Sequence, residues 1–186
     1  MDGQEIAIPL APANNQYTGR ETCDSFEIIY TYETPTVPAT EVTVTYTVET
    51  DGRIHVQADY CGKQGLPELP VFGMRFLMPT AAEGYTYEGL SGETYPDRMA
   101  GGIHGVYEVQ GLPVTPYMVP QDCGMHMQTK WLEIVRKTSL DNTDRGGRSS
   151  RLKITAEEGK DFAFSCLPYT AQELENAMHH EELPPA

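Results

Sequence analysis

Residues 42–58 read VTVTYTVETDGRIHVQA, and this stretch decides the fold. Its first half places apolar side chains at every second position, with threonines and a glutamate between them. A period of two is typical of a β-strand with one buried face. Asp51-Gly52 is the residue pair expected of a tight hairpin turn, and Ile54, Val56 and Ala58 continue the alternation beyond it. We therefore predict an antiparallel hairpin with one apolar face.

Further short strands extend outward from this hairpin. The composition, with 17 Gly, 14 Pro and 11 Tyr, favours strands joined by turns over long helices. The other predicted strands cover residues 26–33, 70–78, 84–90, 130–135, 152–155 and 161–166. One helix is predicted over residues 171–178, because Thr170 and Glu173 form a capping box at its start. The predicted fold class is all-β, an antiparallel β-sandwich with one short helix near the C-terminus.

The domain organisation follows from these elements. We assign residues 1–23 to an N-terminal arm or partial strand and residues 24–186 to the sandwich domain. An open sheet edge next to the terminal helix would promote aggregation, so we expect the domain to continue past Ala186. Residues 91–125 are rich in glycine and proline and show no clear period. A loop of this length often carries function, so the candidate site is sought there.

The charge balance excludes several classes of partner. Acidic residues outnumber basic ones by 27 to 13, which gives a formal net charge of −14. Such a chain repels nucleic acid and anionic membrane surfaces. The N-terminus lacks the features of a signal peptide, and no apolar run is long enough to span a bilayer. Four widely spaced cysteines without a CxxC pair indicate free thiols and a cytoplasmic location, although an even number leaves two disulfides open.

Carboxylates gather at the start of the irregular region. Glu88, Glu93 and Asp97 lie close together in sequence, and glycoside hydrolysis needs two carboxyl groups that flank the scissile bond. Asp97 beside Arg98, with Tyr95 nearby, is more typical of a loop held by charge-assisted hydrogen bonds. We interpret this segment as a structural anchor and assign no catalytic residue in it.

Histidines, a cysteine and tyrosines offer further candidates. His104 and His126 fall in the irregular region, and two histidines with a carboxylate suit general acid–base chemistry. Cys123 and His126 give only half of a zinc site, so we predict no metal site. Aromatic rings also stack on the apolar faces of sugars, although sandwich cores are rich in tyrosine as well. The tyrosines that raise this question are Tyr85, Tyr87, Tyr95, Tyr107 and Tyr117.

The run YEGLSGETYPDR (residues 87–98) resembles a signature of the large β-galactosidases of glycoside hydrolase family two. Other segments agree with that family in the same order, and together they cover residues 24–183. They are DGRI (residues 51–54), LPVFGMRF (69–76), PYMVPQDCG (116–124) and FSCLPYTAQELENA (164–177). The part of the family that they resemble is its C-terminal sandwich, the small-chain domain, which has a galactose mutarotase-like fold.

This resemblance implies a supporting role in a larger enzyme. The family's nucleophile and acid/base glutamates lie in a separate barrel domain that this chain lacks. The chain is then expected to be a partial, non-catalytic sandwich of a retaining β-galactosidase, without a cofactor of its own, and Mg²⁺ is expected only in the parent. Its partner would be the catalytic barrel of a homo-oligomeric parent, whose active-site rim it would buttress around a galactoside. The rim or anchor candidates are Glu93, Tyr95, Asp97, Arg98 and Tyr117.

The same family places an aromatic residue in its galactose pocket from a Gly-Gly-x-x-Ser-Trp segment, which this sequence does not contain. Two alternatives from other functional classes stay open. One is a galactoside-binding module that uses the tyrosine-rich region. The other is a stand-alone aldose epimerase that uses His104, His126 and a glutamate.

Overall fold

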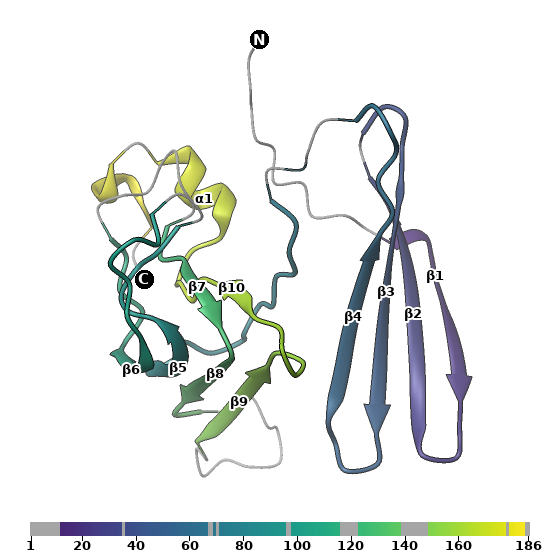
Figure 1. Ribbon diagram of the computed structural model, residues 1–186, viewed down its shortest axis with the longest axis horizontal. Coiled ribbons are helices and arrows are strands. Elements are labelled where there is room, and N and C mark those ends of the chain that lie inside the picture. Colours follow the sequence, from purple (N-terminus) through teal and green to yellow (C-terminus); the bar gives the residue numbers. More distant parts are fainter. Residues whose placement is uncertain are drawn as a thin grey trace. The chain divides into compact units, whose positions relative to one another are not determined.

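The computed structural model describes residues 12–34, 36–66, 69, 71–95, 98–115, 123–138, 149–177 and 179–184. The chain divides into two compact units, Met1–Met74 and Arg75–Ala186. Figure 1 shows that both are built almost entirely from antiparallel strands, with one short α-helix in the second unit. This architecture confirms the predicted all-β class with a short helix near the C-terminus and is consistent with a β-sandwich. The predicted boundary after residue 23 stays a prediction.

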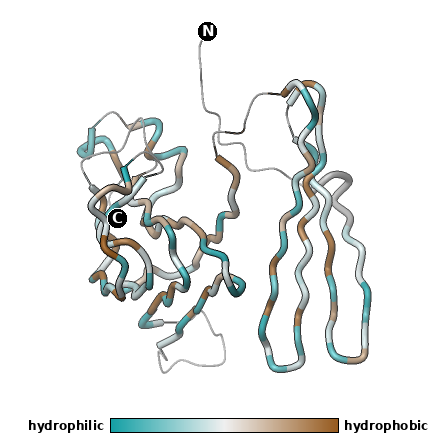
Figure 2. Tube along the Cα trace, viewed as in Figure 1, coloured by the Kyte–Doolittle hydropathy of each residue, from teal (hydrophilic) through white to brown (hydrophobic). Residues whose placement is uncertain are grey.

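The first unit is a four-stranded antiparallel sheet in which each strand pairs with the next along the chain. Its order is β1 (Pro12–Glu21), β2 (Ser25–Glu33), β3 (Glu41–Glu49) and β4 (Ile54–Tyr60). In the β3–β4 hairpin, Val44 pairs with Ala58 and Tyr46 pairs with Val56. Side chains on one face are therefore apolar in both strands, as predicted from residues 42–58. Figure 2 shows the hydropathy alternating along these strands.

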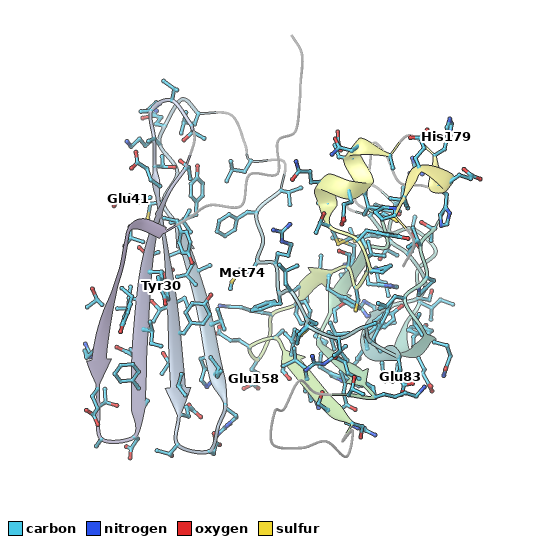
Figure 3. All side chains as sticks on the ribbon, turned by 180° about the vertical axis from the view of Figure 1, so that it is seen from behind. Tyr30, Glu41, Met74, Glu83, Glu158 and His179 are labelled. Atoms are coloured by element: carbon cyan, nitrogen blue, oxygen red, sulfur yellow. The ribbon has the colours of Figure 1, made fainter. Side chains whose placement is uncertain are left out.

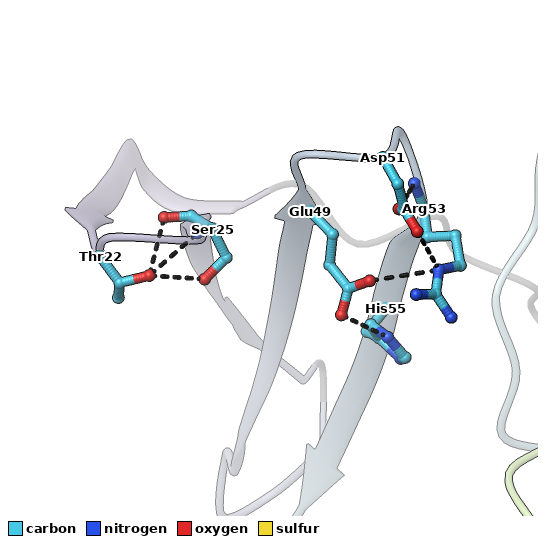
Figure 4. A network of polar contacts seen from close by, with 6 residues as sticks. All are labelled: Thr22, Ser25, Glu49, Asp51, Arg53 and His55. Atoms are coloured by element: carbon cyan, nitrogen blue, oxygen red, sulfur yellow. Dashed lines mark hydrogen bonds and ion pairs between the residues drawn. The ribbon is translucent and has the colours of Figure 1, made fainter.

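A network of polar contacts closes the end of this hairpin (Figure 4). Arg53 Nε lies 2.7 Å from Asp51 Oδ2 and 3.3 Å from a Glu49 carboxylate oxygen. His55 Nε2 lies 3.0 Å from the other oxygen of Glu49. The backbone N–H of Arg53 also donates to Asp51, and this hydrogen bond is the main reason why the pKa of Asp51 is lowered. The turn itself depends on Gly52, whose φ is +87°.

The second unit contains two sheets that share one core. The larger sheet has the order β6 (His104–Gln110), β5 (Gly84–Leu90), β8 (Trp131–Arg136) and β9 (Ser150–Thr155). The smaller one pairs β7 (His126–Thr129) with β10 (Phe162–Phe164). The core between them consists of Tyr85, Tyr87, Leu132, Ile134 and Phe164. The ring of Phe164 lies 5.6 Å from that of Tyr85 and 5.4 Å from that of Tyr87, so β10 covers the inner face of β5.

The helix α1 (Ala171–Asn176) begins as predicted. The hydroxyl of Thr170 accepts from the N–H of Glu173, and the Glu173 side chain accepts from the N–H of Thr170. The helix ends earlier than predicted because Ala177 has an extended backbone; Met178 lies outside the described residues. Leu174 and Ala177 pack with Cys123 in a second small core. A 3₁₀ turn, η1 (His180–Glu182), follows.

Three strand predictions require correction. Residues 71–78 form no strand within the part of the chain that the structure describes, although their sequence is largely apolar. The irregular region predicted over residues 91–125 contains β6, where the half-buried Gly105, Tyr107 and Val109 alternate with exposed residues. The last strand covers residues 162–164 and is shorter than the predicted 161–166. β6 pairs with the preceding strand β5 and β10 pairs with β7, whereas residues 71–78 pair with no strand in the described part of the chain.

The thiols and the helices complete the description. All four cysteines are free, with Cys123 buried and Cys23 and Cys61 exposed. Burial raises the pKa of the Cys166 thiol to about 11. Among the described residues, no helix has the length and apolar character needed to cross a membrane.

The hairpin turn yields a first prediction. Gly52→Ala should lower the free energy of unfolding by about 1–2 kcal/mol, because an L-residue is strained at a left-handed φ. An added Cβ at Gly52 meets nothing within 4 Å, so the effect would come from the backbone alone. Gly73→Ala is the matched control, because Gly73 also has open space and no positive φ. Urea denaturation followed by circular dichroism measures both, and equal midpoints would contradict the prediction.

Candidate functional site

The predicted site residues lie in and around the loop that follows β5. Glu93, Tyr95 and Arg98 are described, whereas Asp97 and Tyr117 lie outside the described residues. Arg98 is exposed, and its backbone N–H donates to the carbonyl of Tyr95 at 2.9 Å. Tyr95 is buried. Three of the five candidates are therefore described, and all three lie between residues 93 and 98.

The carboxylate of Glu93 braces this loop. Its Oε2 accepts a hydrogen bond from the Tyr95 hydroxyl at 2.8 Å and another from the Thr115 hydroxyl at 3.0 Å. Thr115 Oγ1 lies 3.6 Å from Cys123 Sγ, which is buried in the small core beside α1. Burial and the nearby Glu93 raise the pKa of Tyr95, so its phenol keeps the proton that it donates. The Glu93 carboxylate thus connects the loop to Thr115 and, through the Thr115 hydroxyl, to Cys123.

Backbone contacts at Thr94 fix the loop from its other side. The N–H of Thr94 donates to the carbonyl of Met125 at 2.8 Å, and the N–H of Met127 donates to the Thr94 hydroxyl at 2.8 Å. Thr94 is buried. Thr94 is thus hydrogen-bonded to the main chain on both sides of His126, the first residue of β7. These bonds hold the loop against that strand.

His126 makes the third connection. Nδ1 lies 2.8 Å from the carbonyl oxygen of Gly92, and Nε2 lies 3.0 Å from the hydroxyl of Tyr85. Because a carbonyl only accepts, Nδ1 carries the proton and Nε2 accepts from the tyrosine when the ring is neutral. Burial lowers the pKa of His126, and the hydrogen bond to Gly92 offsets part of that effect. The neutral ring therefore links the loop to β5.

The other carboxylate of the segment has its own partner. Glu88 Oε2 accepts from the indole N–H of Trp131 at 2.6 Å, on the face of the sheet opposite the core. Lys153 Nζ lies over the Trp131 ring, 5.0 Å from its centroid. Glu88 and Glu93 are thus held by different sets of groups, and the described residues do not present them as an acid–nucleophile pair.

The chain as a whole matches the family described as beta galactosidase small chain over residues 6–186. This chain belongs to that family. A beta-galactosidase small subunit from Latilactobacillus sakei is 59% identical over 184 residues, which cover 99% of this chain and 58% of that protein. A beta-galactosidase from Streptococcus thermophilus is 36% identical over 162 residues, 86% of this chain and 15% of that protein. A beta-galactosidase from Bifidobacterium adolescentis is 34% identical over 164 residues, 87% of this chain and 15% of that protein.

These proteins are longer than the chain that they match. The small-chain sequence spans 58% of the Latilactobacillus sakei subunit and 15% of the Streptococcus thermophilus protein. The predicted resemblance to the small-chain domain of β-galactosidases is confirmed by the family match.

The two histidines of the epimerase alternative do not meet in this small-chain fold. His104 is exposed on β6, and its Nε2 lies 2.8 Å from Gln128 Oε1. His126 is buried, and both of its ring nitrogens are paired with other groups. The described residues contain no group of three or more His, Cys, Asp or Glu side chains that suits a metal ion.

Four of the five candidate tyrosines are described, and they belong to the core of the second unit or to the loop beside it. Tyr85, Tyr87 and Tyr95 are buried. Tyr107 packs against the same core and donates its hydroxyl to the carbonyl of Ile103 at 2.7 Å. Tyr117 lies outside the described residues. These four candidate tyrosines therefore offer no open platform for a sugar ring.

Sequence analysis missed the groups that hold the loop in place. Thr94 and Thr115 were not candidates, and His126 was considered only for catalysis or metal binding. The alternation of Tyr85 and Tyr87 with Thr86 and Glu88 was the available signal, because it places both tyrosine rings on the buried side of β5. The partners of Thr94 and Thr115 come from contacts between distant parts of the chain.

A double-mutant cycle tests the Glu93 brace. Tyr95→Phe should lower the free energy of unfolding by about 1–3 kcal/mol, because a carboxylate loses a hydrogen-bond donor. In a Glu93→Gln background the same change should cost less, since the acceptor is no longer charged. Thermal unfolding of the four proteins gives the coupling energy. Additive effects of the two substitutions would show that the contact does not stabilise the loop.

The buried His126 predicts a pH dependence of stability. Its pKa is lower in the folded chain than the unfolded value of about 6.5, so only the unfolded state takes up a proton as the pH first falls below that value. The free energy of unfolding should therefore be highest above about pH 6.5. As the pH falls below that value, it should decrease by up to about 1.4 kcal/mol per pH unit until the folded state is protonated too.

The measurement compares urea midpoints at pH 7 and pH 5 for three proteins. His126→Gln should show a smaller loss between the two pH values than the parent, whatever its absolute stability. His104→Gln is the control, because His104 is exposed, and it should keep the loss seen in the parent. A parental loss retained in His126→Gln would assign the pH dependence to other groups.

Proposed function

We propose that this chain is a non-catalytic portion of a β-galactosidase small subunit, and that it supports the active-site rim of a catalytic barrel. The observation that carries the proposal is the match over 99% of the chain to a protein named as a beta-galactosidase small subunit. The reaction of the complete enzyme would be retaining hydrolysis of terminal β-galactosides, which follows from the resemblance to glycoside hydrolase family two.

The geometry of the loop supports a structural role. Retaining hydrolysis needs a free carboxylate nucleophile and a carboxylic acid about 5–5.5 Å from it. Glu93 accepts from two hydroxyl groups, and Glu88 accepts from an indole N–H. These contacts engage each carboxylate with the protein's own groups. Such contacts fix the position of the loop, as is expected of a loop that a neighbouring domain packs against.

The partner in this proposal is a large subunit or domain that contains the catalytic barrel. Of the rim or anchor candidates, Arg98, Asp97 and Tyr117 would face that partner, whereas Glu93 and the buried Tyr95 would hold the loop in place. A galactoside would be reached only through the rim. Any Mg²⁺ requirement would belong to the partner. A homo-oligomeric parent enzyme and a cytoplasmic location complete the proposal.

The test is an activity assay with the purified chain. The chain alone should not hydrolyse a chromogenic β-galactoside above the buffer rate, with or without Mg²⁺. Adding a catalytic subunit that lacks its small subunit should raise kcat/KM by about a hundredfold, the order of loss expected when an active-site group is misplaced by about 1 Å. The chain should be produced in a host without its own β-galactosidase, so that no contaminant contributes.

Two results would overturn the proposal. Turnover at enzyme-like rates by the chain alone, abolished by Glu93→Gln or Glu88→Gln, would make it a catalyst. A catalytic subunit that is unaffected by the chain, although the two form a complex, would exclude a role at the rim.

A further inference from the structure

The turn of the β3–β4 hairpin contains a dipeptide that can modify itself chemically. Asp51 and Gly52 are both exposed, and an added Cβ at Gly52 would meet nothing within 4 Å. Figure 3 shows this turn at the end of the sheet away from the labelled Glu41, the first residue of β3. An aspartate side chain closes on the main chain most readily when glycine follows it, because glycine has no side chain to hinder the approach. The Asp51-Gly52 pair is therefore a candidate modification site.

The reaction in question is a cyclisation followed by a hydrolysis. The amide nitrogen of Gly52 attacks Cγ of the Asp51 carboxylic acid, a bond forms between these two atoms, and the hydroxyl leaves as water with the proton of the amide. Water then adds to one of the two carbonyl carbons of the resulting succinimide ring and breaks its bond to nitrogen. Opening at Cγ restores aspartate, whereas opening at the main-chain carbonyl gives isoaspartate, in which the main chain passes through Cβ and Cγ. One water is released and one is consumed, so no other reactant is needed.

Three hydrogen bonds engage the groups that would react (Figure 4). Asp51 Oδ1 accepts from the backbone N–H of Arg53 at 3.0 Å, and Asp51 Oδ2 accepts from Nε of Arg53 at 2.7 Å. The N–H of Gly52 donates to the carbonyl oxygen of Glu49 at 3.0 Å. Cyclisation removes one carboxyl oxygen as water and takes the proton from the Gly52 nitrogen. It therefore breaks at least two of these three bonds, one of them to Arg53.

The contacts with Arg53 also keep the carboxyl group in its unreactive form. Only the protonated carboxyl group can lose a hydroxyl as water, and the hydrogen bonds from Arg53 lower the pKa of Asp51, with the backbone N–H as the largest cause. The charged neighbours of Arg53 at this turn are paired as well. Glu49 Oε2 lies 3.3 Å from Arg53 Nε, and Glu49 Oε1 lies 3.0 Å from His55 Nε2. Arg53 thus links the Asp51 carboxylate to the rest of the network.

We infer that Asp51-Gly52 is a site of succinimide and isoaspartate formation, and that Arg53 protects it from this modification. Isoaspartate would lengthen the main chain between Glu49 and Arg53, whose N–H and carbonyl are joined across the turn by a hydrogen bond of 2.9 Å. The length of a hairpin loop fixes the register of its two strands, so the modification would disturb the pairing of β3 with β4. The inference rests on contacts within one hairpin and is independent of the function proposed for the chain.

Incubation of the folded chain in heavy-oxygen water tests the inference, because each passage through the succinimide leaves one heavy oxygen in the carboxyl group. Samples kept at mildly acidic pH are digested in ordinary water. Mass spectrometry of the peptide that contains Asp51 then measures the label, and electron-transfer fragmentation distinguishes isoaspartate from aspartate. Arg53→Met removes the side-chain donor. Arg20→Met is the matched control, because Arg20 is an arginine of the same sheet with a similar side-chain exposure, 70% against 72%, and pairs with Glu27.

The label should enter Asp51 about fivefold faster in Arg53→Met than in the parent, the factor expected when one exposed charged pair is lost. Arg20→Met should label at the parental rate. Glu49→Gln should also stay close to that rate, because it changes the partner of Arg53 and His55 but leaves the contacts of Asp51 in place. A synthetic peptide of residues 47–57, which lacks the folded sheet, should label faster than the parent.

Three outcomes would overturn the inference. Equal rates in the peptide and the parent would show that the folded turn gives no protection. Equal rates in Arg53→Met and the parent would show that the Arg53 side chain is not the protecting group. Acceleration by Glu49→Gln as large as that by Arg53→Met would assign the protection to the stiffness of the whole hairpin. Circular dichroism checks that each variant is folded, and Arg53→Lys, which keeps the charge without Nε and should label at an intermediate rate, repeats the test if Arg53→Met is not.

Discussion

The second unit depends on the placement of one buried imidazole. The ring of His126 lies 4.5 Å from that of Tyr87 and 4.9 Å from that of Phe164, so it is packed between β5 and β10. Both nitrogens must be satisfied in such a position, because an unpaired polar atom inside a core is costly. Tyr85 satisfies one and the carbonyl of Gly92 the other. The two sheets and the loop after β5 are therefore held in one arrangement, and a change at any of these groups affects all of them.

This constraint, together with two further contacts, gives the loop after β5 a specific shape. The loop is tied to the core through His126, to β7 through Thr94 and to the small core through Glu93 and Thr115. A loop held at three points over a rigid sheet presents its exposed side to a partner with little loss of conformational entropy on binding. Such rigidity suits a domain whose contribution to an enzyme is position.

The parts of the fold that sequence predicts well are those that depend on neighbours in sequence. The β3–β4 hairpin follows from a period of two and an Asp-Gly turn, and the start of α1 follows from a capping box within four residues. The predicted strand was wrong over residues 71–78, and β6 was missed, because a strand is completed by a ladder with a partner that the local sequence does not specify. The same limit applies to the site. The bond from Tyr95 to Glu93 is local, whereas Thr115 and His126 reach the loop from 22 and 34 residues away.

The two units also differ in what stabilises them. The second unit buries a shared aromatic core between two sheets. The described part of the first unit has a single sheet, and the ion pairs at its hairpin end are exposed, where such pairs add little to stability. Apolar burial is the dominant favourable term in folding, and Val42 and Val44 are the only buried hydrophobic residues in the described part of the first unit. The described part of the first unit therefore gains less of its stability from a buried apolar core than the second unit does.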